Sequence, residues 1–393
     1  MSQEVLAGLR VAHLATVAST LRYLLLPQLE AARDAGATVI GVSADGPDVA
    51  VLEAAGVEHV VLASSTRQLD PVADLRAARD LWRLVRELRI DVLHTHTPKP
   101  GVYGRIVGRL AGVPAVVNTN HGLFATELDR LPRRLAVWTA EGVASRFSHA
   151  ELLQNSEDLA FMERNRLLPR GKAVLLGNGI DLQRFAPVAD AVESDRRAAL
   201  RHELGATEGT VVVGFVGRLV AEKGIRELLA AARLLDDRYV VALIGPADTD
   251  KSDAVDASEL DHGRAAGVKV LGHRLDVDEW YRAMDLFVLP SHREGFPRAA
   301  MEAAASGLPV IASDVRGCRQ VVDQGTTGLL VPVRDPAALA AAIRRLGDDA
   351  DLRSAMGAAG AELARREFDE RRVVELVLDT YQRLTGRSGG AAD

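Results

Sequence analysis

This sequence has little cysteine, no long apolar run and no strong excess of one charge. Its 393 residues include one cysteine, Cys318, so an intrachain disulfide is excluded and a reducing cytosol is favoured. It contains no stretch of 18 apolar residues and no N-terminal signal-peptide pattern, so we expect neither a membrane-spanning segment nor export by a signal peptide. The net charge of −6 gives no indication of a nucleic-acid partner.

Glycine is missing from the segment that follows the first predicted strand. Residues 16–27 read TVASTLRYLLLP, and no G-x-G-x-x-G pattern follows the apolar run at 9–16. The glycines of that pattern let a dinucleotide pyrophosphate approach the backbone. Their absence argues against a dinucleotide-dependent oxidoreductase.

The sequence does contain apolar strand patterns that alternate with helical periodicity. In the first half we predict strands at 9–16, 38–43, 91–94 and 115–118, with helices at 23–35, 49–55 and 73–89. Such alternation is typical of a parallel, doubly wound α/β sheet, so we assign residues 1–185 to a first Rossmann-like domain.

A second alternating block begins at residue 211 and runs to about residue 366. Between the blocks, residues 186–210 are rich in alanine, proline and charge and contain one helix near 194–204, so we predict a linker there. With 393 residues and a hydrophobic content of 48%, the chain can form two sizeable cores. We expect two doubly wound domains facing a cleft, where ligands commonly bind.

The most informative segment is VLPSHREGFPRAAME at 288–302, because it carries two carboxylates. It reads as a strand end, a polar loop containing Glu294 and Gly295, and a helix that begins near Pro297 and carries Glu302. Open α/β sheets bind ligands at such strand ends, and helix N-termini favour anions. A carboxylate there suggests recognition of sugar hydroxyls beside a phosphate. A glutamate in the first helical turn and a solvated glutamate on the helix are the alternative roles.

A second segment, VVVGFVGRLVAEKG at 211–224, places two cations in a loop between a strand and a helix. Arg218 follows Gly217, and Lys223 comes five residues later. A guanidinium binds phosphate oxygens as a planar fork and lysine acts as a mobile point charge, so together they could hold a diphosphate. Two solvated cations, with Lys223 paired to Glu222, are the alternative.

Together these segments resemble the family-4 retaining glycosyltransferases of GT-B fold. The resemblance rests on GRLVAEKG, EGFPRAAMEAAASGLPVIASD, GTTGLLVPVRDPAALAAAI and LLGNGIDLQRFAP. The N-terminal half, with DVLHTHTPKPGVYGRIVGRLAGVPAVVNTNHG, is similar to the branch that acts in capsule, O-antigen and exopolysaccharide assembly. The resemblance covers nearly the whole chain. It implies that the last helix, near 370–384, returns to the N-terminal domain, which binds the acceptor, while residues 211–366 bind the nucleotide sugar.

The resemblance also implies roles for individual residues. Arg218 and Lys223 would stabilise the leaving diphosphate, Glu294 would bind sugar hydroxyls, and Glu302 would bind the ribose. The implied donor-binding set is Gly217, Arg218, Lys223, His273, Arg274, Glu294, Gly295, Phe296, Pro297 and Glu302, in which the backbone near His273 and Arg274 reads the base. Attack by the acceptor on the same face, with the leaving phosphate taking the proton, would need no protein base.

In the N-terminal half, His121 matches the family's histidine that contacts the donor sugar, so we count it with Arg218, Lys223 and Glu294 as catalytic. Lys99 and Arg105 flank glycines at a predicted helix start and are candidate contacts for an acceptor diphosphate; solvated side chains are the alternative. His94 and His96 could share one face of a strand. No third metal ligand is evident beside them, and enzymes of this fold generally need no bound metal, so we expect none.

The resemblance implies transfer of a hexose or N-acetylhexosamine from a UDP-sugar, without a further cofactor, to a lipid-linked sugar or growing glycan. It implies a cytoplasmic location, with peripheral contact at the inner membrane for a lipid-linked acceptor, and no nucleic acid as partner. Four alternatives stay open: a small natural-product acceptor, an inverting GT-B transferase, a sugar-nucleotide epimerase, and a catalytically silent subunit that binds a nucleotide sugar.

Overall fold

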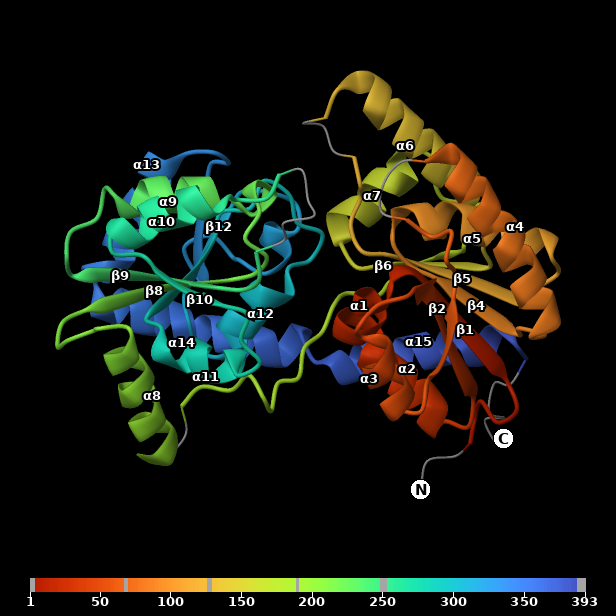
Figure 1. Ribbon diagram of the computed structural model, residues 1–393, viewed down its shortest axis with the longest axis horizontal. Coiled ribbons are helices and arrows are strands. Elements are labelled where there is room, and N and C mark those ends of the chain that lie inside the picture. The colour runs from red at the N-terminus through yellow and green to blue at the C-terminus, as the bar shows by residue number, and fades with distance from the viewer. Residues whose placement is uncertain (1–3, 67–69, 126–128, 189–190, 248–252, 387–393) are drawn as a thin grey trace. The chain divides into compact units, whose positions relative to one another are not determined.

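The computed structural model describes residues 4–66, 70–125, 129–188, 191–247 and 253–386. The chain divides into two compact units (Figure 1). Unit 1 comprises Met1–Gly177 with Arg371–Asp393, and unit 2 comprises Asn178–Glu370. Among the described helices, none combines the length and the apolar character needed to cross a bilayer.

Unit 1 is built on one parallel sheet of seven strands in the order β3-β2-β1-β4-β5-β6-β7. The strands are β1 (Arg10–Val17), β2 (Thr38–Ala44), β3 (Glu58–Val61), β4 (Val92–Thr95), β5 (Ala115–Asn120), β6 (Ala150–Leu153) and β7 (Ala173–Leu175). The helices are α1 (Ala18–Thr20), the π-helix η1 (Leu21–Leu25), α2 (Leu26–Asp34), α3 (Val49–Ala54), α4 (Pro71–Glu87), α5 (Pro98–Leu110), α6 (Leu131–Ala144), α7 (Ser156–Arg164) and α15 (Glu370–Leu384).

The first strand shows why helices cover both faces of this sheet. Successive side chains of a strand point to opposite faces. Val11 and Ala15 pack in a cluster with residues of α2 and α15, whereas Ala12 and Leu14 pack with residues of α4 and α5. Both faces are therefore apolar, as in a doubly wound sheet. Figure 1 shows α15, the last helix in sequence, among the helices of unit 1.

Unit 2 repeats this arrangement with a six-stranded parallel sheet in the order β10-β9-β8-β11-β12-β13. Its strands are β8 (Val211–Val216), β9 (Tyr239–Ile244), β10 (Lys269–Gly272), β11 (Leu286–Leu289), β12 (Val310–Ser313) and β13 (Gly328–Val331). Its helices are α8 (Ala191–Glu203), α9 (Ile225–Ala232), α10 (Ala257–Ala265), α11 (Val277–Ala283), α12 (Arg298–Ala305), α13 (Pro336–Gly347) and α14 (Ala350–Glu367), with short 3-10 segments η2 (Ala221–Lys223) and η3 (Cys318–Gln320).

The expected linker 186–210 belongs to unit 2 instead of lying between two domains. Within its described part, which leaves out 189–190, Leu200 of α8 is buried in the core of unit 2. Arg197 and Arg201 of α8 donate to the two oxygens of Asp285 at 3.0 and 2.8 Å. The helix that the sequence predicted near 194–204 is present, but its apolar contact and ion pairs fix it to unit 2.

The boundary between the units lies earlier than the predicted residue 185. Ile180 pairs in parallel with Asp369, and its N–H donates to Phe368 O at 2.9 Å. A Cβ on Gly179 would lie 2.4 Å from Glu370 Cα, so the chain enters and leaves unit 2 along one tight crossing. The chain therefore passes from one unit to the other at Gly177/Asn178 and Glu370/Arg371, and the last helix belongs to unit 1.

Candidate active site

An ion pair between Lys223 and Glu294 joins the two motifs of unit 2. Lys223 Nζ lies 2.6 Å from Glu294 Oε1, and their side chains are 23% and 8% exposed. The lysine ends η2, after β8, and the glutamate lies in the loop between β11 and α12. The neighbouring strands β8 and β11 run parallel, so both loops leave the carboxyl edge of the sheet. The structure thus brings together two residues that lie 71 positions apart in sequence.

Glycines allow these loops to approach each other closely. Gly224 has a φ of 73°, and a Cβ there would lie 2.0 Å from Pro290 O. A Cβ on Gly317 would lie 2.4 Å from Glu294 O. No side chain fits at such distances, so glycine is required at both positions for the Glu294 loop to keep its path.

Two neighbours of this pair were not singled out from the sequence. His292 Nε2 lies 2.9 Å from Glu227 Oε1, and the His292 N–H donates to Glu222 O at 2.8 Å. Ser291 is fully buried, and its Oγ has no hydrogen-bond partner among the described residues. The sequence signal for them was their place in the SHRE run after β11. Through its backbone hydrogen bond to Glu222, His292 connects the Glu294 loop to η2, the segment that carries Lys223.

Glu302 lies on α12, and its carboxylate is held by a tyrosine. Tyr281 OH donates to Glu302 Oε2 at 3.0 Å, and Arg298 Nε is 3.9 Å from Glu302 Oε1. Burial raises the pKa of Glu302 from its ordinary value, against the lowering effects of Arg298 and Tyr281. One carboxylate oxygen therefore keeps acceptor capacity for a ligand hydroxyl.

The segment of Gly295, Phe296 and Pro297 leads directly into the first residue of α12. Asn178 Nδ2 donates to Phe296 O at 3.0 Å, and the Phe296 ring packs edge-on against Phe368 at 5.8 Å. Asn178 belongs to the GNGID run, so that motif supports the donor loop. The structure thereby gives Asn178 a contact that the sequence did not indicate.

The other residues predicted to bind the donor occupy two separate loops of unit 2. Gly217 follows β8 and donates to Ile244 O at 2.9 Å, and Arg218 after it is half-buried. His273 is exposed after β10, while Arg274 donates to both oxygens of Asp276 at 2.9 and 2.7 Å. The Arg274 side chain is thus committed to its neighbour, and base recognition in this loop would fall to the backbone.

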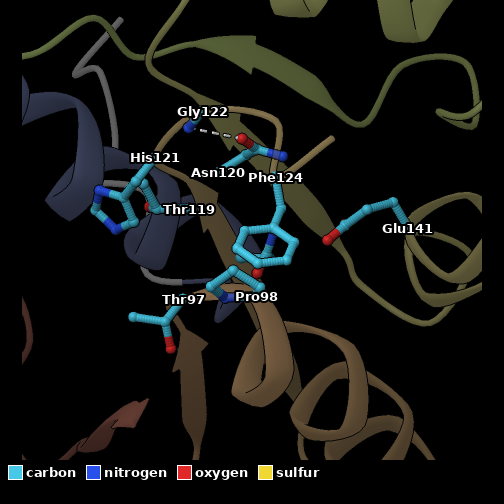
Figure 2. A pocket seen from close by; sticks show the side chains of 9 residues that line it. Thr97, Pro98, Thr119, Asn120, His121, Gly122, Phe124 and Glu141 are labelled. Atoms are coloured by element: carbon cyan, nitrogen blue, oxygen red, sulfur yellow. Dashed lines mark hydrogen bonds between the residues drawn. The ribbon is translucent and has the colours of Figure 1, made fainter. Parts of the chain in front are cut away.

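In unit 1, His121 lines a small pocket of about 40 Å³ at the carboxyl end of β5 (Figure 2). The other lining residues are Thr97, Pro98, Asn118, Thr119, Asn120, Gly122, Phe124 and Glu141. His121 Nδ1 lies 3.2 Å from Gln154 Oε1 and Nε2 lies 3.1 Å from His96 Nδ1. Burial lowers the pKa of His121 to about 4, so the ring is neutral at pH 7.

The prediction that Arg105 contacts an acceptor is wrong. Its side chain is fully buried and donates to Glu151 Oε1 at 2.9 Å and Glu141 Oε2 at 2.5 Å. Burial alone would lower the pKa of Arg105, but the two carboxylates outweigh it and the pKa is raised. Arg105 thus neutralises two buried acids. The sequence could not show this, because the acids lie 36 and 46 residues further along the chain.

Lys99, the other candidate acceptor contact, is also paired. Its Nζ lies 2.5 Å from Asp74 Oδ1, and the lysine side chain is 17% exposed. The contact joins the first turn of α5 to α4.

His94 and His96 have a third histidine beside them, contrary to the reading of the sequence. His13, on β1, pairs with His94 in the sheet register, and ligand atoms of His13, His94 and His96 lie within 4.8 Å of one another. All three are fully buried. His13 was missed because the sequence did not identify β1 as the neighbour of β4, the strand that carries His94.

Both halves of the chain match families of known proteins. Residues 27–184 match Glycosyltransferase Family 4, and residues 196–363 match Glycosyl transferases group 1. The chain is 31% identical over 314 residues to a D-inositol 3-phosphate glycosyltransferase of Xylanimonas cellulosilytica, covering 76% of this chain and 73% of the relative.

The name of another relative specifies a lipid-linked sugar as its acceptor. The chain is 29% identical over 288 residues to the UDP-Gal:alpha-D-GlcNAc-diphosphoundecaprenol alpha-1,3-galactosyltransferase of Escherichia coli, covering 72% of this chain and 73% of the relative.

The fold has solved counterparts. The crystal structure of HepE from Anabaena in complex with UDP superimposes with a TM-score of 0.78 at 23% identity, covering 95% of this chain and 100% of that one. With its two parallel Rossmann-like sheets and both family matches, the chain belongs to the family-4 glycosyltransferases of GT-B fold.

Proposed function

We propose that this glycosyltransferase moves a hexose or N-acetylhexosamine from a UDP-sugar to a hydroxyl of a lipid-linked sugar or growing glycan, with retention at the anomeric carbon. The Lys223–Glu294 pair carries the proposal, because it sets a cation for a diphosphate beside an acceptor for sugar hydroxyls. The Escherichia coli relative, which uses UDP-galactose and an undecaprenol-linked acceptor by its name, supports the donor and acceptor classes.

In the proposed reaction the bond between the anomeric carbon and the diphosphate oxygen breaks, and negative charge grows on that oxygen. Lys223 and Arg218 stabilise this charge, and preorganised charges act most strongly where water is scarce. Lys223 has three N–H donors, so it can bind a phosphate oxygen while it keeps Glu294. Glu294 accepts hydrogen bonds from sugar hydroxyls, and Glu302 accepts one from the ribose.

The acceptor oxygen then bonds to the anomeric carbon on the face that the diphosphate leaves. Its proton passes to the leaving diphosphate oxygen, so atoms and charge balance without a protein base. The neutral state of His121 supports this route, because both ring nitrogens are already hydrogen-bonded and burial disfavours its protonation. We assign His121 to contact with the donor sugar. A retaining route of this kind requires no metal or further cofactor.

The test is nucleotide release from UDP-, GDP- and TDP-sugars, with and without a polyprenyl-diphosphate sugar, and NMR of the anomeric configuration of the product. Release from one donor that is lost in Arg218→Ala and Glu294→Ala supports the proposal. The matched control is Arg226→Ala, which removes an exposed arginine paired with Glu259 on the same unit. An inverted product overturns retention, and UDP binding without turnover on any acceptor favours a silent subunit.

A small phosphorylated acceptor is the second candidate. It is supported by the 31% identity to an enzyme named for D-inositol 3-phosphate. Adding D-inositol 3-phosphate as a separate acceptor to the release assay discriminates the two. Faster release with this acceptor than with the lipid-linked sugar would move the assignment to the small-acceptor class.

For a lipid-linked acceptor we further propose a peripheral membrane contact through the start of α6. Leu131 and Leu135 are 58% and 52% exposed, and Arg133 beside them is 46% exposed. Apolar side chains with flanking arginines suit an anionic lipid surface. Sedimentation with phosphatidylglycerol vesicles should fall in Leu131→Glu/Leu135→Glu and stay unchanged in Leu234→Glu, a matched change at another exposed leucine.

A further inference from the structure

Four histidines and one tyrosine form a continuous hydrogen-bonded chain behind the His121 pocket of unit 1. His13 lies on β1, His94 on β4, His96 just after β4 and His121 just after β5, while Tyr381 comes from α15. Alternating residues of a strand share one face. His13 shares the face of Val11 and Ala15, against which α15 packs, so the histidines and Tyr381 meet on that face.

The first part of the hydrogen-bonded chain runs from Gln154, beside His121, to Tyr381. Gln154 Oε1 lies 3.2 Å from His121 Nδ1, and His121 Nε2 lies 3.1 Å from His96 Nδ1. His96 Nε2 lies 3.1 Å from His13 Nδ1, and His13 Nε2 lies 3.1 Å from Tyr381 OH. Each contact joins the Nδ1 of one ring to the Nε2 of the next, or to an end group.

The second part runs from the tyrosine to a threonine of β5. Tyr381 OH lies 2.5 Å from His94 Nδ1, and His94 Nε2 lies 2.7 Å from Thr119 Oγ1. The two parts together use both ring nitrogens of all four histidines.

One placement of protons satisfies every contact. Gln154 Oε1 can only accept, so His121 Nδ1 carries a proton and His121 Nε2 accepts from His96 Nδ1–H. The same step repeats from His96 to His13, whose Nε2 accepts the hydroxyl proton of Tyr381. The Tyr381 oxygen accepts from His94 Nδ1–H, and Thr119 donates to His94 Nε2. All four rings are then neutral, with the proton on Nδ1.

Burial favours this neutral chain over a charged one. His13, His94 and His96 are fully buried, and burial lowers the pKa of His13 to about 3 and that of His94 and His96 well below the usual value. The neighbouring histidines add to the lowering for His94 and His96. An imidazolium among them would lack water and a carboxylate partner in the chain, which is costly.

A metal ion is the competing explanation, because His13, His94 and His96 place ligand atoms within 4.8 Å of one another. A metal would need one nitrogen from each ring and would break the contacts just described. The alternation of donors and acceptors through Tyr381 and His121 uses every ring nitrogen without a metal, so the hydrogen-bonded chain accounts for more of the geometry.

We propose that His96, His13 and Tyr381 are positioning residues that, together with Gln154, hold His121 as the neutral Nδ1–H tautomer in one fixed ring orientation. Gln154 sets the direction of the hydrogen bonds, because its oxygen can only accept. Tyr381 gives the last helix a role at the pocket, because its hydroxyl links His13 to His94 and keeps the hydrogen-bonded chain continuous. Only the consequence for catalysis rests on the proposed function, namely that His121 contacts the donor sugar.

The experiment is ¹⁵N NMR of ring nitrogens in histidine-labelled full-length protein, without substrate, at pH 7.5. The signals are assigned with single His→Gln variants, and exposed His202 serves as an internal reference. We expect His13, His94, His96 and His121 each to show a protonated Nδ1 and an unprotonated Nε2. Tyr381→Phe removes a donor to His13 and an acceptor for His94, so mixed tautomers should appear at these two histidines, while Gln154 keeps the proton on His121 Nδ1. Tyr23→Phe, at an exposed tyrosine of the same unit, should leave them unchanged.

Gln154→Met tests the other end and keeps the proposal testable if Tyr381→Phe fails to fold. It removes the one partner that can only accept, so mixed tautomers should appear first at His121 and His96. A protonated Nε2 on His121 in the wild type overturns the proposal, as does a folded Gln154→Met protein with unchanged His121 and His96 signals. One equivalent of tightly bound divalent metal, measured by mass spectrometry, also overturns it.

Kinetics then separate this inference from the proposed function. If His121 contacts the donor, Gln154→Met should raise KM for the donor about threefold to tenfold, because losing one hydrogen bond releases the His121 ring from its fixed orientation, with a smaller change in kcat. Mixed tautomers with an unchanged KM would confirm the chain and remove His121 from donor binding, which is a failure of the proposed function alone.

Discussion

Unit 1 and unit 2 each hold a cation beside carboxylates, but in opposite surroundings. Arg105 in unit 1 is fully buried between Glu141 and Glu151, whose side chains are 9% and 1% exposed. Lys223 in unit 2 is 23% exposed and pairs with Glu294. In sequence both cations lie near a glycine at a helix start, and both looked like phosphate ligands. Burial distinguishes a cation that completes a core from one that can bind a ligand.

The difference predicts where a substitution will act. A buried ion pair that loses one partner leaves an uncompensated charge, so the cost falls on folding. An ion pair whose cation reaches solvent costs less to break, so more of the effect of changing it falls on ligand binding. Changes in the buried polar groups of unit 1 should therefore affect unfolding, and changes at the unit 2 loops should affect turnover.

The largest expected effect on stability is that of Arg105→Met. It leaves Glu141 and Glu151 buried without their cation, so the free energy of unfolding should fall by about 3–5 kcal/mol. Urea denaturation followed by circular dichroism measures this. The triple variant with Glu141→Gln and Glu151→Gln should recover part of the loss. A stable Arg105→Met protein with a raised KM for the acceptor would return Arg105 to the acceptor site.

Lys223→Ala and Glu294→Ala should show the reverse pattern. Each removes a group proposed to act on the donor as charge develops, so kcat/KM should fall about 10²- to 10³-fold, as for a lost oxyanion-stabilising donor. The melting temperature should fall less than in Arg105→Met, since Lys223 is 23% exposed whereas Arg105 is fully buried. Nucleotide-release kinetics measure kcat/KM, and calorimetry measures the melting temperature. A large stability loss with normal kcat/KM would break the contrast between the units.

Acid should destabilise the protein through the histidines of unit 1. Burial lowers the pKa of His13 to about 3 and of His121 to about 4, whereas an unfolded histidine titrates near 6.5. Between about pH 6.5 and pH 4 the unfolded state binds more protons, so stability is complete above this range and falls as the pH drops through it. Each histidine can contribute up to about 1.4 kcal/mol per pH unit.

Urea denaturation at pH 7, 6 and 5 tests this dependence. His13→Asn should flatten the fall relative to the wild type, whereas His202→Asn, at an exposed histidine, should not. If the free energy of unfolding falls equally with pH in the wild type, His13→Asn and His202→Asn, the buried histidines do not titrate as described.

The smallest expected effect is that of Asn178→Ala. It removes one donor to Phe296 O, a contact of 3.0 Å that supports the start of α12. A lost hydrogen bond of this kind is worth about 0.5–1.5 kcal/mol, so KM for the donor should rise about twofold to tenfold. Asn165→Ala, which removes a similar side-chain contact to Phe161 O in unit 1, is the matched control. Equal KM values in the two variants would remove Asn178 from the support of the donor loop.

Much of the local structure could be predicted from the sequence. The strands expected at 38–43 and 115–118 are present as β2 and β5, and the helix expected at 73–89 is α4, Pro71–Glu87. These elements carry a clear apolar period and nearby start signals, such as Pro71 and the capping Asp70. The sequence placed Lys223 and Glu294 each in a loop after a strand, but only the structure shows that these strands, β8 and β11, are neighbours.

The partners of buried polar groups could not be predicted in the same way. Arg105 finds its acids 36 and 46 residues away, and His13 meets Tyr381 across 368 residues. Neither contact leaves a local pattern in the sequence. The linker at 186–210 was misread for the same reason, since its composition is polar and only packing shows that α8 joins unit 2.

The sequence by itself determined the two Rossmann-like sheets and the loops that carry the donor-site residues, because apolar periodicity and glycine positions are local properties of the chain. Only the tertiary structure decided which polar residues face a ligand and which face each other. Parallel strands that are distant in sequence bring the loops of Lys223 and Glu294 to one edge of their sheet, where Lys223 stays partly exposed. Burial inside unit 1 pairs Arg105 with its acids and keeps the histidines neutral.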